Sequence, residues 1–160
     1  MEDGLSVGTE AIEFDGSFAP LTQAYLQLTG GTLTGDLTVN GHIQGGGNIP
    51  GLVAGAGAGS GPPSPVLQTG STDLGGFITW GTGTSPNTQA QLSMTFGKAW
   101  VIPGGGNPHV SLTPANSATA ALGVMFIAGL SPTGFTINVS TAPAASQGNT
   151  TYALCYTVMG

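Results

Sequence analysis

Side chains that could carry out catalysis are scarce in this 160-residue chain. From residue 71 to the end, the sequence contains one acid, Asp73, and one histidine, His109. Hydrolysis by paired carboxylates needs two acids about 5–10 Å apart, and a catalytic triad needs an acid that orients its histidine. Because the C-terminal half offers neither combination, we expect that the protein is not an enzyme.

Sites for metals, nucleotides or disulfides are equally poorly supported. Cys155 is the only cysteine, so no second thiol exists for a disulfide or a zinc site, and His42 and His109 would need further ligands. The glycine-rich runs contain neither the glycine–lysine pattern of a phosphate loop nor a GxGxxG turn between a strand and a helix. We therefore expect no cofactor and no metal. The alternative is an ion on the axis of an oligomer, held by one His or Asp from each chain.

Charge is low and unevenly distributed. Charged residues make up 5% of the chain, whereas an ordinary soluble protein has about 25%. Lys98 is the only cation, and neutralising nucleic-acid phosphates takes several Lys or Arg, so we expect no nucleic-acid partner. Five of the seven acids lie in the first fifteen residues: Glu2, Asp3, Glu10, Glu13 and Asp15.

Membrane insertion is not expected either. The longest apolar run, residues 118–130, is shorter than the stretch of about 20 residues that crosses a bilayer as a helix. Residues 1–15 are acidic and lack the apolar core of a signal peptide. The sequence therefore predicts a protein that is made in the cytoplasm without a signal peptide.

The first of three regions, residues 1–44, holds Leu/Thr pieces of only a few residues between glycines. Pieces this short cannot form a globular core alone, since strands usually run to about 5–6 residues. They suit an intertwined β neck in which each chain pairs with two copies of itself. The apolar residues that we expect to form this trimer are Leu28, Leu33, Leu37 and Val39.

The second region, residues 45–70, is rich in Gly, Ala and Pro and is predicted to be a linker. Its GAGAGS string resembles silk, but a single copy gives no array to stack. Glycine recurs every two residues and not every three, so collagen is excluded as well. Gly, Ala and Ser favour a flexible tether, and the prolines of residues 62–65 favour a short stiffer piece.

The third region, residues 71–160, alternates apolar and polar residues between frequent turn signals. This pattern predicts an antiparallel β-sandwich or jelly roll, and hence an all-β fold class. The run at residues 124–130 reads as a strand buried on both faces. The seven strands are expected near residues 77–80, 89–96, 98–102, 109–113, 124–130, 135–140 and 151–158.

Several side chains of the third region could bind a ligand. An exposed aromatic ring that stacks on a sugar, with amide groups nearby, makes a glycan site. Trp80 adjoins a Gly-Thr-Gly turn and is therefore the better candidate for exposure, whereas Trp100 lies among core-type residues. Each aromatic could equally be a core residue, and His109 could cap a loop. The candidate glycan-binding residues are Trp80, Trp100, Asn107 and His109.

Residues Tyr25–Gly41, YLQLTGGTLTGDLTVNG, resemble a Leu/Thr/Gly stretch of bacteriophage tail fibres, baseplate appendages and head fibres. The resemblance implies a parallel homotrimer with an N-terminal virion-attachment part and a C-terminal β domain that binds the host surface. Residues 92–160 are also similar to the β-sandwiches of fibre tips and H-type lectins, through PHV at 108–110, TGFTI at 133–137 and the final strand. The charged residues that often contact sugar in those lectins have no counterpart here, so this second resemblance implies a sugar site only loosely.

These resemblances predict a phage virion structural protein: a homotrimeric fibre or spike located in the virion, whose partners are other virion proteins and a host-surface glycan. The alternative is a capsid decoration or cement protein, or a head fibre, with a purely structural role. In the fibre interpretation the acidic N-terminus docks on the virion, and it could equally be a solvated tail. The candidate docking residues are Glu10, Ile12, Glu13, Phe14 and Asp15.

Overall fold

The computed structural model describes residues 36, 38, 40, 41, 48–145 and 149–160. The chain divides into two compact units, Met1–His42 and Ile43–Gly160, and the second contains nearly all of the described residues. The predicted trimer contacts at Leu28, Leu33, Leu37 and Val39 lie outside the described residues. The predicted docking residues, Glu10, Ile12, Glu13, Phe14 and Asp15, lie outside them as well.

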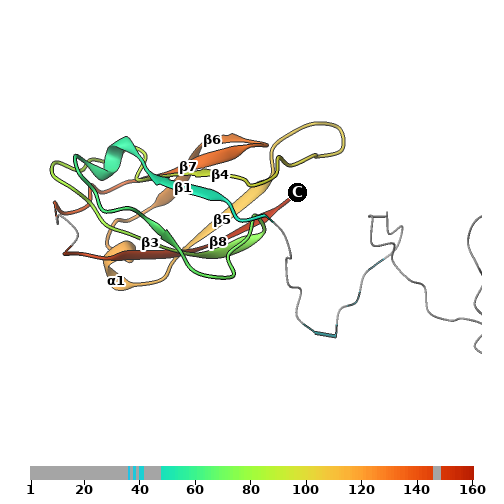
Figure 1. Ribbon diagram of the computed structural model, residues 1–160, viewed down its shortest axis with the longest axis horizontal. Coiled ribbons are helices and arrows are strands. Elements are labelled where there is room, and N and C mark those ends of the chain that lie inside the picture. The colour runs from blue at the N-terminus through green and yellow to red at the C-terminus, as the bar shows by residue number, and fades with distance from the viewer. Residues whose placement is uncertain (1–35, 37, 39, 42–47, 146–148) are drawn as a thin grey trace, which may run out of the picture. The chain divides into compact units, whose positions relative to one another are not determined.

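The second unit is a sandwich of two four-stranded antiparallel sheets (Figure 1). One sheet has the order β1 (Gly51–Ala54), β4 (Leu92–Thr95), β7 (Gly134–Val139) and β6 (Met125–Ser131). The other has the order β2 (Val66–Leu67), β3 (Gly75–Trp80), β8 (Tyr152–Met159) and β5 (His109–Pro114). Two single turns of helix, η1 (Ala56–Ala58) and α1 (Ser117–Ala120), complete the described elements. The all-β prediction is confirmed.

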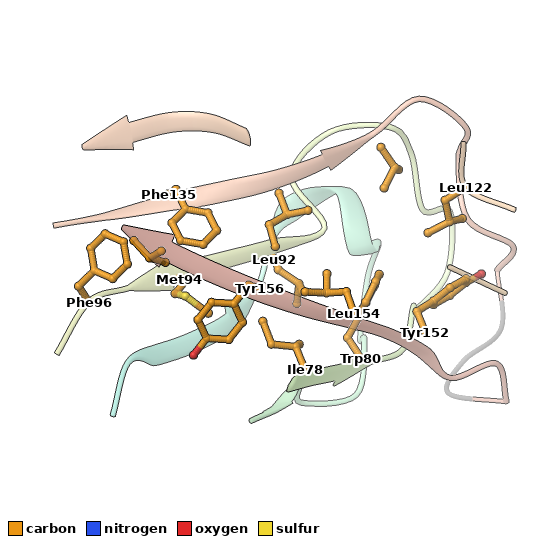
Figure 2. Close-up of a cluster of buried hydrophobic side chains, with 13 residues drawn as sticks. Ile78, Trp80, Leu92, Met94, Phe96, Leu122, Phe135, Tyr152, Leu154 and Tyr156 are labelled. Atoms are coloured by element: carbon orange, nitrogen blue, oxygen red, sulfur yellow. The ribbon is translucent and has the colours of Figure 1, made fainter. Parts of the chain in front are cut away.

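The core lies between the sheets because the central strands alternate in polarity with a period of two. In β4 and β7 the buried positions are Leu92, Met94, Phe135, Ile137 and Val139. In β3 and β8 they are Ile78, Trp80, Tyr152, Leu154, Tyr156 and Val158, and Ala153 is buried as well. Figure 2 shows these side chains meeting between the two layers. Burial of one such side chain contributes about 1.5–3 kcal/mol, which makes this interleaved cluster the main source of the fold's stability.

Two predicted strands differ from the structure. Residues 98–102 form a loop, in which the backbone N–H of Trp100 donates to the carbonyl of Pro132 and that of Gly105 to Ile102. Residues 124–130 do overlap β6, but β6 pairs only with β7 and forms the edge of its sheet. Val124 is 67% exposed and Phe126 45% exposed, so burial on both faces was a wrong prediction. An edge strand has a paired neighbour on one side only, and the alternation of apolar and polar residues does not distinguish it from a central strand.

The segment predicted to be a linker contributes to both sheets. Within its described part, residues 48–70, β1 pairs with β4 and β2 pairs with β3. Between them, the backbone N–H groups of Gly55 and Gly57 donate to the carbonyls of Gln91 (2.9 Å) and Ala90 (2.7 Å). A Cβ at either glycine would collide with the backbone at Ala90 or Gln89. Glycine is therefore required here for close backbone approach, and the sandwich begins well before residue 71.

The chain enters this sandwich at the end where it also leaves it. Asn48 packs against Gly97, and the C-terminal Gly160 packs against Trp100. Figure 1 shows the long loop between β4 and β5 beside the C-terminus, with α1 towards the other end. None of the described helices is long and apolar enough to cross a membrane.

Candidate functional site

The two charged side chains of the sandwich line the same cavity. Six of the seven acids lie in residues 1–42, so residues 43–160 contain a single acid, Asp73, and a single lysine, Lys98. The cavity has a volume of about 270 Å³. We call it the Asp73–Trp100 cavity, and its lining residues are Asn48, Thr72, Asp73, Leu74, Lys98, Ala99 and Trp100.

Asp73 is fixed by its hydrogen bonds to two other segments. Its Oδ1 accepts from the backbone N–H of Gly97 at 2.8 Å, and its Oδ2 accepts from the backbone N–H of Lys98 at 3.0 Å. Its own backbone N–H donates to the carbonyl of Asn48 at 3.1 Å. Hydrogen bonds to an ionised carboxylate are stronger than neutral ones. Asp73 thus joins the chain entry, the turn before β3 and the loop after β4.

The turn that carries Asp73 is held from the core side by Tyr156. The Tyr156 hydroxyl donates to the carbonyl of Thr72 at 2.6 Å. Burial of the ring is the larger cause, and the negative charge of Asp73 the smaller one, of a rise in the pKa of Tyr156 to about 12. The hydroxyl therefore stays protonated at neutral pH and remains a donor, which keeps Thr72 and Asp73 in place.

Trp100 forms an aromatic part of the cavity wall. Its ring is half-buried and meets the Phe96 ring edge-on, with centroids 6.1 Å apart. The Phe96 ring in turn packs on the Phe135 ring, with centroids 5.7 Å apart, and this packing anchors the loop to the core. The indole Nε1 of Trp100 is buried and has no hydrogen-bond partner among the described residues. Trp100 is thus held by packing and by its backbone bond to Pro132.

The cavity combines a cation, an aromatic ring and a carboxylate that is already hydrogen-bonded. Such a set can bind a small polar ligand, with ring packing on one side and a charge-assisted hydrogen bond on the other. Within the described part of the chain, no three His, Cys, Asp or Glu residues come together as metal ligands would. The geometry therefore supports recognition of a ligand.

The structure separates the four predicted glycan-binding residues. Trp100 lines the cavity, whereas Asn107 and His109 are exposed on the following loop and at the start of β5, and neither lines the cavity. The expected exposure of Trp80 is wrong, because its side chain is 3% exposed and stacks on Tyr152 with ring centroids 5.3 Å apart. Trp80 shares the parity of the buried Ile78 in β3, and this signal was readable in the sequence. Trp80 also borders a second, smaller cavity of about 170 Å³.

Sequence reasoning missed Asp73 and Lys98 as partners. The signal available in the sequence was that Asp73 is the only acid and Lys98 the only lysine from residue 43 onward. Their proximity depends on backbone hydrogen bonds across 25 positions of sequence, which no local pattern reveals. Comparisons of the chain with protein-family models, with curated proteins and with solved structures found no match.

Proposed function

We propose that this chain is a non-enzymatic subunit of a homotrimeric bacteriophage virion appendage, whose β-sandwich contacts a glycan on the host surface. The fibre-like Tyr25–Gly41 motif supports the virion assignment, and it precedes the compact sandwich in the chain. Six of the acids lie before residue 43, a distribution suited to a docking part that is separate from a recognition part.

The Asp73–Trp100 cavity is the observation that carries the recognition role. It places a half-buried tryptophan beside the only lysine of the chain, and apart from this lysine and Asp73 no Asp, Glu, Lys or Arg occurs in residues 43–160. Aromatic packing combined with a few polar groups is typical of small-ligand sites. A sugar residue presents both an apolar face and hydroxyl groups, so it fits this combination.

The purely structural alternative, a capsid decoration protein or a head fibre without a receptor, has its own support. The outward positions of the sheet β2–β3–β8–β5 include Val66, Cys155, Thr157 and Met159, all exposed and uncharged. Surfaces with almost no net charge tend to associate. Such a face suits permanent packing against capsid proteins or other copies of the chain.

Host contact is tested by blocking phage adsorption with the purified full-length chain. We expect the protein to coat host cells and to lower adsorption, and Trp100→Phe or Lys98→Gln to weaken both effects. A protein that neither coats cells nor slows adsorption would favour the structural alternative. Imaging of the intact particle then places the chain on the tail or on the capsid.

Two further measurements test the trimer and the absence of catalysis. Light scattering after size exclusion is expected to give three times the chain mass of 15.7 kDa. A monodisperse monomer contradicts the homotrimer. Incubation with host polysaccharide is expected to leave the length of the polymer unchanged, and shortening would make the protein a depolymerase.

A further inference from the structure

Lys98 is the only cation of the chain, and its exposed side chain lines the Asp73–Trp100 cavity. Its backbone N–H is used by Asp73 Oδ2, and among the described residues its ammonium has no ion-pair partner. The ammonium therefore remains available as a charged donor of three hydrogen bonds.

Asp73 contributes less to ligand binding than its charge suggests. Each carboxylate oxygen already accepts one backbone N–H, from Gly97 and from Lys98. These two donors lie at the Asp73 carboxylate and offset part of its negative charge locally. Lys98 is the only positively charged donor in the lining of the cavity, and such a donor favours a negatively charged acceptor.

The rest of the cavity limits what can carry this acceptor. Leu74, Ala99 and Trp100 supply apolar surface beside Lys98. The volume of about 270 Å³ lies just below the range of about 300–1,000 Å³ that is common for ligand pockets. A single pyranose ring fits this size, and its C–H face can pack on the apolar side while an attached acidic group reaches Lys98.

We propose that the Asp73–Trp100 cavity binds a carboxylate-bearing sugar, a hexuronic acid or a similar acidic residue, with its carboxylate on the Lys98 ammonium. The proposal rests on the proposed function and specifies the glycan class that the sandwich takes from the host surface. Asp73 also lines the cavity, and its role in this proposal is to position Lys98 by holding its backbone N–H.

A matched pair of ligands tests this assignment on the full-length chain. Methyl glucuronide and methyl glucoside differ only in the carboxylate that replaces a CH₂OH group. The chain has two tryptophans, so its two indole N–H signals in ¹⁵N-correlated NMR can be assigned with Trp100→Phe and Trp80→Phe. We expect methyl glucuronide to shift the Trp100 signal in a saturable manner, with little effect on the buried Trp80, and methyl glucoside to bind at least about fivefold more weakly.

Variants of Lys98 show whether the affinity for the sugar depends on the positive charge of this side chain or on its shape. Because this side chain is exposed, Lys98→Gln is expected to fold normally and to lose about fivefold in affinity for methyl glucuronide, whereas Lys98→Arg keeps the charge and most of the affinity. Equal binding of the two sugars, an unchanged affinity in Lys98→Gln, or shifts at Trp80 alone would overturn the proposal. Tighter binding of glucose 6-phosphate than of methyl glucuronide would also overturn it, in favour of a phosphate ligand.

Failure of the acidic-sugar proposal can be distinguished from failure of the proposed function. If the chain blocks adsorption but does not bind methyl glucuronide, the acidic-sugar proposal fails and the proposal of host contact stands. If the chain binds methyl glucuronide but does not affect adsorption, the site is real and its role on the host surface fails.

Discussion

The Oδ2 atom of Asp73 accepts a hydrogen bond from the backbone N–H of Lys98 at 3.0 Å, so the only acid of the sandwich positions its only cation. The backbone N–H of Gly97 donates to Oδ1, so both carboxylate oxygens of Asp73 accept a hydrogen bond.

The first prediction concerns these two hydrogen bonds. Asp73→Ala replaces both acceptors with water, which should lower the free energy of unfolding by about 1–3 kcal/mol because hydrogen bonds to a charged group are stronger than neutral ones.

Urea denaturation measures the effect of Asp73→Ala. Asp73→Asn keeps one acceptor oxygen and should lose less, and Asp36→Ala changes the other described acid, which is exposed, and should change stability little. Equal stability of Asp73→Ala and the parent chain would show that the carboxylate does not hold the loop at residues 97–98.

The second prediction concerns Tyr156 at alkaline pH. Below pH 10 its phenol is protonated in both states, so it adds no pH dependence. Because the pKa of Tyr156 is raised to about 12 in the folded protein, the unfolded state loses the proton first between pH 10 and 12. Stability should therefore fall over this window by roughly 3 kcal/mol in total, since each pKa unit corresponds to about 1.4 kcal/mol.

Unfolding in urea at a series of pH values compares the parent chain with Tyr156→Phe. At neutral pH the variant should be less stable by about 1 kcal/mol, because the bond to the carbonyl of Thr72 is lost. Between pH 10 and 12 the parent should lose this advantage and become the less stable of the two, because its loss of roughly 3 kcal/mol exceeds the initial difference of about 1 kcal/mol. Parallel curves would mean that the phenol has the same proton affinity in both states.

The third prediction concerns the glycine-rich segment. A Cβ at Gly57 would collide with the Gln89 carbonyl, so Gly57→Ala should lower stability by about 1–3 kcal/mol. At Gly51 the nearest atom to a new Cβ is 3.8 Å away, and Gly51→Ala is therefore the matched control, expected within about 0.5 kcal/mol of the parent. A flexible tether would tolerate both changes equally in thermal unfolding.

The fourth prediction distinguishes the two tryptophans. Trp80 is 3% exposed, whereas Trp100 is half-buried at the cavity. In Trp100→Phe the remaining Trp80 should fluoresce at shorter wavelength and resist quenching by acrylamide. In Trp80→Phe the remaining Trp100 should be quenched more strongly. Similar quenching in both variants would contradict the placement of Trp80 in the core.

Much of the sandwich follows from local pattern. Alternation predicted the strands that contain Phe77–Trp80 and Phe135–Val139 and the inward positions of Leu92, Met94 and Leu154, because a strand points successive side chains to opposite faces. The same alternation placed Trp80 beside Ile78, but the Gly-Thr-Gly turn after it suggested exposure. Burial by the facing layer outweighed that local cue, since Trp80 stacks on Tyr152 of β8.

The candidate site was predictable only in part. Trp100 was singled out from its residue type, but its surroundings were not, because its loop is also held by Pro132 and Gly160 from two other parts of the chain. The strand expected at residues 98–102 is absent from the described sandwich for a related reason. These residues bond to a turn and to a carboxylate, and no neighbouring strand pairs with them.

By itself, the sequence determined the all-β class, the inward faces of the central strands and the separation of acidic residues 1–42 from a nearly uncharged remainder, because these depend on composition and on a period of two. Only the tertiary structure decided that Gly55 and Gly57 are packed, that β6 is an edge and that Asp73 lies against Lys98. Each of these depends on contacts between distant segments. Close backbone approach and hydrogen bonding across 24 or 25 positions leave no periodic signal in the chain.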